Sequence, residues 1–449
     1  MAKYKAYPEY KESGVKWLDK LPLKWSTEKT KRMFSLKRNL VGHLSSSFQL
    51  LSLTLNGVVP RDISSGEGKI PASFDTYQSV QAGDLIFCLF DIDETPRTIG
   101  LAEQDGMITG AYNVYSCMDK CLPGYAYYYF LHIDSFKGLK PFYTGLRKVV
   151  RAETFGCIEM PNPSLSEQEK ICLFLDHETA KIDNLIEKQQ QLIELLKEKR
   201  QAVISHAVTK GLNPNVPMKN SGVEWLGEIP EHWLCTKIKY IALLTPKKSS
   251  VNFKNNDECT FIPMEKLKRN SLVTDESKLI RDVISGYTYF EDDDLLLAKV
   301  TPCFENKNIA VARGLVNNIG FGSTEIYVLR PTEKIRVYYL LYRLQEENFI
   351  RTATGAMTGA GGLKRVPSDF LLNYPIAIPP KPEMDAIVAY LNAQEVHYDL
   401  MEKNATQAVQ LLQERRTALI SAAVTGKIDV RDWVAPDTQN VEEPQEATA

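Results

Sequence analysis

The sequence lacks the long apolar segments that mark membrane and secreted proteins. No eighteen apolar residues stand together in its 449 residues, and the opening MAKYKAYPEYKE has no apolar stretch of the signal-peptide kind. The composition, with 44% hydrophobic and 24% charged residues, also lacks the bias of a disordered chain. We therefore expect a globular, cytoplasmic protein, and the length predicts two or more domains.

Motifs for catalysis, metal binding and nucleotide binding are absent too. The eight cysteines include no CxxC pair and the six histidines no HExxH spacing, which argues against a zinc or disulfide framework. No GxSxG elbow and no GxxxxGKS or GxxxxGKT loop occurs. The sequence therefore predicts no catalytic residue, no metal site and no cofactor in this chain. A net charge of −2 weighs against a general polyanion binder but leaves room for a local basic face.

What the sequence does contain is an internal repeat. The segment SGVKWLDKLPLKW, from Ser13, recurs as SGVEWLGEIPEHW from Ser221. Four further segments recur in the same order, the last being LKEKRQAVISHAVTKG against LQERRTALISAAVTGK, and the offset drifts only between 208 and 217 residues. Ordered repeats of this kind indicate a duplicated unit. The four tryptophans of the opening segments are predicted to pack inside each half.

Each half ends in a long predicted helix. From Ser166 to Val208 there is no Pro or Gly, and Ser166 with Glu169 predicts a capping box, with Gly211 as the stop. Pro382 and Gly426 bound the matching helix. Some forty residues give a rod of roughly 60 Å, which suits a spacer.

Residues that recur every seven positions define the seam along which these two helices are predicted to pair. Polar residues such as Glu178, Gln189 and Lys199 lie on this seam, which favours paired helices over the core helix of an ordinary bundle. Tandem halves predict a pseudo-twofold with antiparallel helices. The apolar seam residues are Ile171, Leu175, Ile182, Leu185, Leu192, Leu196, Val203, Ile387, Leu391, Tyr398, Met401, Leu412 and Leu419.

The parts that precede the helices are predicted to be mixed α/β with short strands such as DLIFCLF, DLLLAKV and EIYVLR. The expected fold class is therefore α+β, with two similar globular domains joined by two long antiparallel coiled-coil helices. The predicted segments are a first domain at 1–165, a first helix at 166–212, a second domain at 213–381, a second helix at 382–428 and a disordered tail at 429–449.

These segments together resemble the specificity subunits of type I restriction-modification systems, over almost the whole chain. The paired openings carry the resemblance, with LLAKVTPCFEN, GFGSTEIYVLRP, PNPSLSEQEKICLFLD and LIELLKEKRQAVISHAVTKGL. One departure is Met384, which stands where the first half has Gln168.

The resemblance implies that each globular domain is a target-recognition domain for one half of a bipartite, asymmetric site in double-stranded DNA. It also implies that the helices set the unread gap and dock two methyltransferase subunits, which nuclease and translocase subunits join. The chain itself would be non-catalytic, and S-adenosylmethionine, ATP and magnesium would belong to the partner subunits.

Basic residues in matching places of the two halves are the candidate DNA contacts. The stretch TATGAMTGAGGLKR, Thr352–Arg365, is predicted to be a mobile loop that meets phosphates. An isolated basic pair is usually a solvated face, but here the pair occurs twice. The candidates, expected on phosphates more than on bases, are Arg147, Lys148, Arg151, Arg351, Lys364 and Arg365.

Three other functions stay open at this point. A specificity subunit that works with a methyltransferase alone would have the same sequence features. A coiled-coil scaffold with two protein-binding heads would bind no DNA. A self-sufficient nuclease ranks last, because the acidic run Glu291–Asp294 is matched only by Gly83–Asp84 in the first half and is predicted to be a turn.

Overall fold

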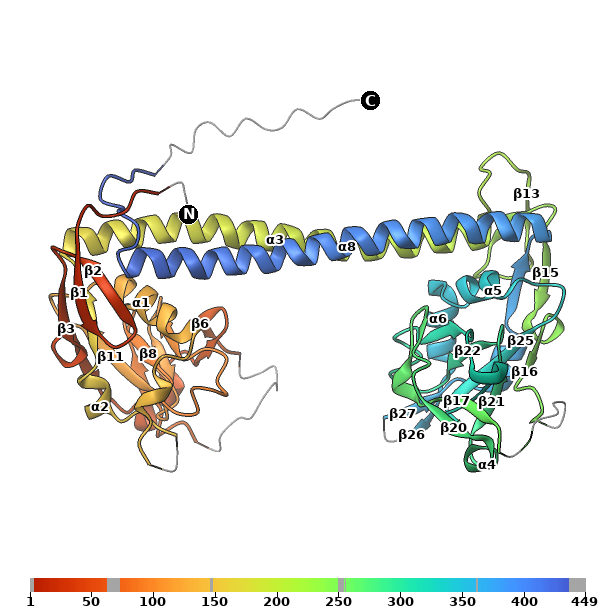
Figure 1. The fold of residues 1–449 in the computed structure, drawn as a ribbon, viewed down its shortest axis with the longest axis horizontal. Coiled ribbons are helices and arrows are strands. Elements are labelled where there is room, and N and C mark those ends of the chain that lie inside the picture. Colours follow the sequence, from red (N-terminus) through yellow and green to blue (C-terminus); the bar gives the residue numbers. More distant parts are fainter. Residues whose placement is uncertain are drawn as a thin grey trace. The chain divides into compact units, whose positions relative to one another are not determined.

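The computed structural model describes residues 4–62, 73–145, 148–248, 254, 256–360 and 362–435. The chain divides into two compact units, one made of residues 1–189 with 407–449 and the other of residues 190–406. Two long helices, α3 (Leu165–Lys210) and α8 (Lys381–Val424), contribute turns to both units (Figure 1). Among the described residues, none of the helices has the length and apolar character needed to cross a membrane.

The first unit consists of short strands, two helices of its own and parts of the long helices. Its strands are β1 (Tyr10–Val15), β2 (Leu18–Pro22), β3 (Ser26–Lys29), β4 (Phe34–Lys37), β5 (Leu51–Thr54), β6 (Gly57–Pro60), β7 (Gln78–Val80), β8 (Leu85–Phe87), β9 (Ile99–Leu101), β10 (Gly106–Ile108), β11 (Asn113–Cys117) and β12 (Glu159–Asn162). Its own helices are α1 (Pro123–Ser135) and α2 (Ala152–Gly156).

The second unit has the same kind of content. Its strands are β13 (Met218–Asn220), β14 (Glu228–Pro230), β15 (Leu234–Lys237), β16 (Ala242–Leu244), β17 (Glu258–Ile262), β18 (Leu267–Lys268), β19 (Ser271–Leu272), β20 (Ser277–Leu279), β21 (Thr288–Glu291), β22 (Leu295–Ala298), β23 (Ile309–Val311), β24 (Ile319–Gly322), β25 (Ile326–Pro331), β26 (Thr358–Ala360), β27 (Leu363–Arg365) and β28 (Pro375–Ile378). Its helices are α4 (Ile280–Val283), α5 (Val337–Arg343), α6 (Glu347–Gly355) and α7 (Ser368–Asn373).

Each unit has a central four-stranded sheet of the same strand order, and the two units differ in the strands around it. The strand order β4-β11-β8-β9 of the first unit reappears as β16-β25-β22-β23 in the second, antiparallel throughout. A second four-stranded sheet, β20-β17-β24-β21, is found in the second unit, where the described part of the first unit has the ribbons β5-β6 and β7-β10. The predicted mixed fold with a tandem repeat is confirmed, and the strands named from sequence all form.

Hydrogen bonds repeat along with the strands. The indole nitrogen of Trp25 donates to Glu167 over 3.1 Å, and that of Trp233 donates to Glu383 over the same distance. Both indoles are fully buried. The opening segment of each half is therefore fixed to the first turn of the helix that ends the same half.

One tyrosine in each unit repeats the pattern between the globular part and the helix. The hydroxyls of Tyr128 and Tyr342 each donate over 2.7 Å to a side chain on the long helix, Asp176 and Asn392 respectively. These two acceptors are 216 residues apart. This pair therefore aligns α1 with α5 and one stretch of α3 with one stretch of α8.

The core of each unit contains residues from both halves of the sequence. In the first unit, Leu419, Ile420 and Val424 at the end of α8 join the cluster that holds Trp25 and Leu175. In the second unit, Ile204 and Val208 at the end of α3 join the cluster that holds Trp233 and Leu391. Because each unit contains the start of one long helix and the end of the other, the helices run antiparallel, as expected.

The first long helix begins slightly earlier than predicted. Ser164 Oγ accepts from the Glu167 backbone N–H over 3.3 Å and donates to its carboxylate over 3.2 Å, so the helix is capped by Ser164 with Glu167 and not by the predicted pair Ser166 and Glu169. Gly426 ends α8 with a φ of +70°, and a Cβ there would lie 2.4 Å from Pro22. Glycine at this stop thus permits both the turn and a close approach.

The seam of the paired helices differs from the prediction at one of the two positions that each seven-residue repeat contributes. Leu185 and Leu192 are 48% and 42% exposed, so they do not lie between the helices. The inward positions fall one residue later, at Ile186 and Ile193, both partly covered, and at Arg200. A seven-residue period allows the second seam residue of each repeat to lie either three or four residues after the first, and only the packing of the helices distinguishes these two possibilities.

Most other predicted seam residues are covered. Ile171, Leu175, Ile182, Ile387, Leu391, Tyr398 and Leu419 are buried, and Leu196, Val203, Met401 and Leu412 are partly buried.

The predicted disordered tail begins with ordered residues. Val430 is buried, and the ring of Trp433 contacts Phe174 of α3 at 5.4 Å between centroids. The backbone N–H of Asp429 donates to the carbonyl of Lys5 over 2.7 Å. Burial of these apolar side chains opposes disorder up to residue 435, and residues 436–449 lie outside the described part of the chain.

Gln168, where the halves depart from each other, provides a test of this packing. Its buried amide accepts from the backbone N–H of Leu122 over 2.8 Å and donates to the carbonyl of Lys120 over 3.0 Å. We expect Gln168→Met, which copies the second half, to lower the free energy of unfolding by about 1–3 kcal/mol, because buried groups lose their partners. Urea denaturation measures this, with exposed Gln190→Met as the control. Equal midpoints for the two variants would contradict it.

Candidate nucleic-acid interface

The stretch Thr352–Arg365 forms a helix end and a hairpin, not the predicted loop. Its first residues belong to α6, and β26 then pairs with β27 in antiparallel register, Thr358 opposite Arg365. Every residue of both strands is exposed. Figure 1 shows this hairpin on the side of its unit away from the long helices. A narrow, exposed ribbon of this kind has the dimensions to enter a DNA groove.

The hairpin is fixed to the central sheet by its second strand. The backbone N–H of Thr301 donates to the carbonyl of Lys364 over 3.0 Å, and the N–H of Val366 donates to Lys299 over 2.9 Å. In the first unit, the N–H of Asp91 donates to the carbonyl of Lys148 over 3.1 Å. Lys148 and Lys364 therefore occupy matching positions in the structure, one residue away from the alignment of the repeated segments GLRKV (145–149) and GLKRV (362–366), which pairs Lys148 with Arg365.

The two lysines differ in what surrounds their charge. Lys148 Nζ lies 3.0 Å from a carboxylate oxygen of Glu94 and 3.3 Å from one of Asp93, and these hydrogen bonds raise the pKa of Lys148. For Lys364, no ion pair is recorded with any residue that the structure describes, and its side chain is exposed. Lys364 can therefore approach a phosphate without leaving a carboxylate.

The remaining basic candidates are scattered. Arg365 forms a two-point ion pair with Glu325, at 2.8 and 3.0 Å, which lowers the pKa of Glu325. Arg351 on α6 donates to Asn348 over 2.8 Å, and Arg151 is the exposed N-cap residue of α2. Arg147 lies outside the described residues. The structure thus brings Lys364 and Arg365 together on one strand and places the others on separate elements.

A cavity of about 410 Å³ on the first unit is a feature that the sequence did not indicate. It lies beside β4 and β11 and is lined in part by Arg38, Gln78, Tyr112 and Asn113, with exposed Leu40 at its rim. These residues come from three separate segments, none of which carries a motif. The cavity has hydrogen-bond donors and acceptors of the kind that read base edges, beside the aromatic ring of Tyr112.

The acidic run of the second unit is a turn, as predicted. Asp294 is buried and accepts two hydrogen bonds of 2.7 Å from Arg330, and Arg313 pairs with Asp293 at 2.8 Å. Burial raises the pKa of Asp294, and the bonds from Arg330 oppose that rise. No group of three or more metal-ligating side chains is found in the part of the chain that the structure describes.

Known proteins resemble this chain in sequence and in fold. No family model matches. The EcoAI specificity subunit of a type I restriction enzyme from Escherichia coli is 34% identical over 219 residues, which are 48% of this chain and 35% of that subunit. The EcoEI specificity subunit from Escherichia coli is 31% identical over 219 residues, 48% of this chain and 34% of the relative. The chain thus matches about a third of the length of these two relatives.

Solved structures match over most of the chain. One from a study of assembly and conformational transition of a type I restriction-modification system has a TM-score of 0.66 and 14% identity, and covers 91% of this chain and 99% of its own. The HsdS subunit of Thermoanaerobacter tengcongensis has a TM-score of 0.51 and 15% identity, with 91% and 98% covered. At this identity the likeness is one of fold.

The two matching lysines make a testable pair. We expect Lys364→Ala to weaken binding to double-stranded DNA more than Lys148→Ala does, because Lys148 is already held by two carboxylates. Loss of one phosphate contact reduces the slope of log K against log salt by about 1. Affinities of the chain for double-stranded DNA over a salt series measure both. An equal or larger effect of Lys148→Ala would contradict the assignment.

Proposed function

We propose that this chain is a specificity subunit of a type I restriction-modification system and determines which DNA sequence the complex recognises. The observation that carries the proposal is the repetition of one framework with two different surroundings. The central sheet, the Trp–Glu bond and the Tyr bond to the helix occur twice. A framework repeated in this way attaches both globular parts to the helices by the same bonds, while their different surroundings allow each part to read a different DNA sequence.

Each globular part is proposed to read one half of a bipartite site in double-stranded DNA. The exposed β26–β27 hairpin with Lys364 and the cavity beside Arg38 are the proposed contact surfaces of the second and first units. Lys364 is assigned to phosphate, which positions the domain, and Arg38 with Asn113 to base edges, which give specificity.

The long helices are proposed to set the unread gap between the two half-sites and to dock methyltransferase subunits. Apolar side chains on the outer faces of the helices support a docking role. Those more than 40% exposed include Leu185, Leu192, Leu195, Leu400 and Leu411. Half-site spacing that mirrors protein geometry is general among DNA-binding proteins with two reading modules.

The chain is proposed to be a non-catalytic member of the complex. Methyl transfer, ATP use and DNA cleavage would belong to partner subunits, which would hold S-adenosylmethionine, ATP and magnesium. Support comes from the acidic turn, where the buried carboxylate of Asp294 accepts two hydrogen bonds from Arg330.

Exchange of one domain tests the proposal of two separate readers. We expect replacement of residues 1–165 by the first domain of another specificity subunit to change one half of the recognised sequence and to leave the other half and the gap unchanged. The measurement is the set of sites modified when the chimera is expressed with its methyltransferase. The matched control replaces residues 213–381 and should change the other half. A chimera with both halves changed, or neither, would contradict the proposal.

A further inference from the structure

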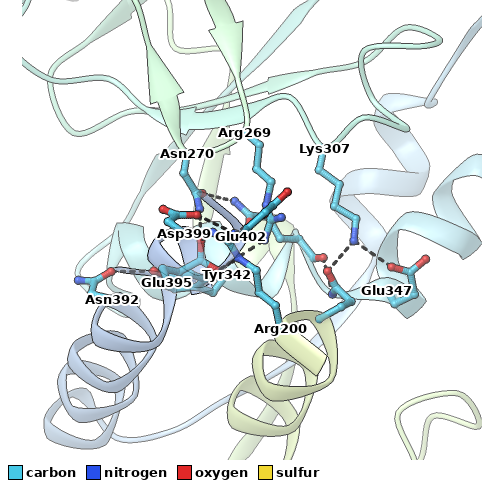
Figure 2. A network of polar contacts seen from close by, with 12 residues as sticks. Arg200, Arg269, Asn270, Lys307, Tyr342, Glu347, Asn392, Glu395, Asp399 and Glu402 are labelled. Carbon is cyan, nitrogen blue, oxygen red and sulfur yellow. Dashed lines mark hydrogen bonds and ion pairs between the residues drawn. The ribbon is translucent and has the colours of Figure 1, made fainter. Parts of the chain in front are cut away.

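A cluster of charged residues, in which Arg200 and Glu395 are buried, lies where the globular part of the second unit meets its two helices (Figure 2). Arg200 of α3 is at its centre, with a side chain only 10% exposed. Its guanidinium donates from Nε to Glu395 over 2.8 Å, makes a second contact with the same carboxylate, and donates to Asp399 over 2.7 Å. Glu402, one turn further along α8, lies 3.9 Å away. Three carboxylates of α8 thus surround one arginine of α3.

The turn between β18 and β19 reaches into this cluster from the globular part. Asn270 donates to Glu395 over 3.1 Å and also bonds Gln345, and Arg269 Nη2 lies 3.5 Å from Glu395. The backbone N–H of Asn270 donates over 2.9 Å to the carbonyl of Ile309 on the central sheet. Glu395 therefore accepts contacts from α3 and from a turn that is itself bound to the sheet.

These contacts are coupled electrostatically. Burial lowers the pKa of Arg269, and the neighbouring charge of Arg200 lowers it further. Burial also acts to lower the pKa of Arg200, but the bonds and charges of Glu395 and Asp399 outweigh it and raise that pKa. Without Glu395, two guanidiniums would face each other in a partly buried site. Removing one member of such a group is strongly destabilising for the arrangement that remains.

Among the described residues of the first unit, this cluster is not repeated. The positions 216 residues before Glu395 and Asp399 are Thr179 and Asp183, and Arg416 corresponds to Arg200. Arg416 keeps one ion pair, with Asp183 at 2.8 Å, while the Thr179 hydroxyl donates to the carbonyl of Leu175, within its own helix.

In the first unit, the turn that corresponds to Arg269–Asn270 is exposed. The β5–β6 hairpin packs on β9 as β18–β19 packs on β23, and its turn residue Leu55 is 63% exposed. A cavity of about 320 Å³ lies beside Arg416, lined also by Arg97, His132 and Lys137. The first unit is thus open where the second is filled by its own side chains.

We propose that Arg269, Asn270 and Glu395 form a latch that fixes the orientation of the second recognition domain on its helices. These are positioning residues, and the inference rests on the proposed function. Apolar contacts around Ile204 and Leu391 already attach the domain, but such contacts have no direction. The latch adds directional bonds one helical turn beyond Leu391, about 6 Å along α8, and so resists rotation about the apolar contact.

A fixed orientation has a consequence for DNA with an altered gap. One extra base pair moves a half-site by about 3.4 Å along the duplex and turns it by about 35°. A latched domain cannot follow this displacement, so the complex loses contacts to the second half-site. Discrimination between gap lengths is therefore assigned in part to the latch.

The test is a double variant, Arg269→Leu with Glu395→Thr, which copies Leu55 and Thr179 of the first unit and leaves the net charge unchanged. The control is Arg336→Leu with Asp385→Thr, which removes an ion pair of 2.9 Å that also joins the domain to α8 but is about half exposed on both sides. Each is compared with the unaltered chain, in complex with its methyltransferase, on duplexes with the native gap and with one base pair added or removed.

We expect the unaltered chain and the control to lose at least about tenfold in affinity on the altered gaps, and the latch variant to lose less than about threefold. A latch variant that discriminates gaps like the unaltered chain would overturn the inference. If the unaltered chain itself binds no bipartite duplex, the proposed function fails and not the latch alone.

Hydrogen exchange of the free chain tests the latch independently of DNA. The amide of Asn270 and the β18–β19 strands should exchange at least about tenfold faster in the latch variant, with β22 unchanged. Unchanged exchange at Asn270 would overturn the inference. Should the double variant fail to fold, Asn270→Ala removes the hydrogen bonds of the Asn270 side chain with Glu395 and Gln345, leaves both charges in place, and is measured in the same way.

Discussion

Neither half of this sequence can complete a core by itself, and the rest of the structure depends on that constraint. The first unit buries Leu419 and Val424 from the end of the second half, and the second unit buries Ile204 and Val208 from the end of the first. The helix that closes each unit therefore arrives from the other half of the chain. Burial of apolar side chains is the main interaction that stabilises folded proteins. The antiparallel pairing of the helices therefore follows from the need to complete both cores.

The same constraint explains which features repeat. Trp25 with Glu167, and Trp233 with Glu383, tie the opening of each half to the start of its own helix, beside the end of the other. Residues at this junction lie beside segments from both halves of the chain, and the same residue types occur at the junction of each unit. Away from it, the sheet edges are free to differ, as the second unit's extra sheet shows. Invariance near the helices and divergence away from them is the pattern that two readers of different sequences require.

The repeat, the long helices and the strands can be predicted from the sequence, because each has a periodic or ordered pattern. The prediction of Leu185 and Leu192 on the seam is wrong, because a seven-residue period does not fix the second position of each repeat, and these leucines are exposed. The contacts of Glu395 could not be predicted, since Arg200 and Asn270 are distant in sequence and a single charge on a helix resembles a solvated one. The basic candidates were identified by matching halves, and only the structure separates paired Lys148 from Lys364.

The central claim is that one chain brings two readers to one DNA site, and base-modification mapping tests it most directly. The chain would be expressed with a type I methyltransferase subunit from the same organism in a host without other modification, and the modified bases located across the genome. The account predicts a single asymmetric motif of two short parts at one fixed gap. A stable complex that modifies no motif, or modifies one uninterrupted motif, would contradict it.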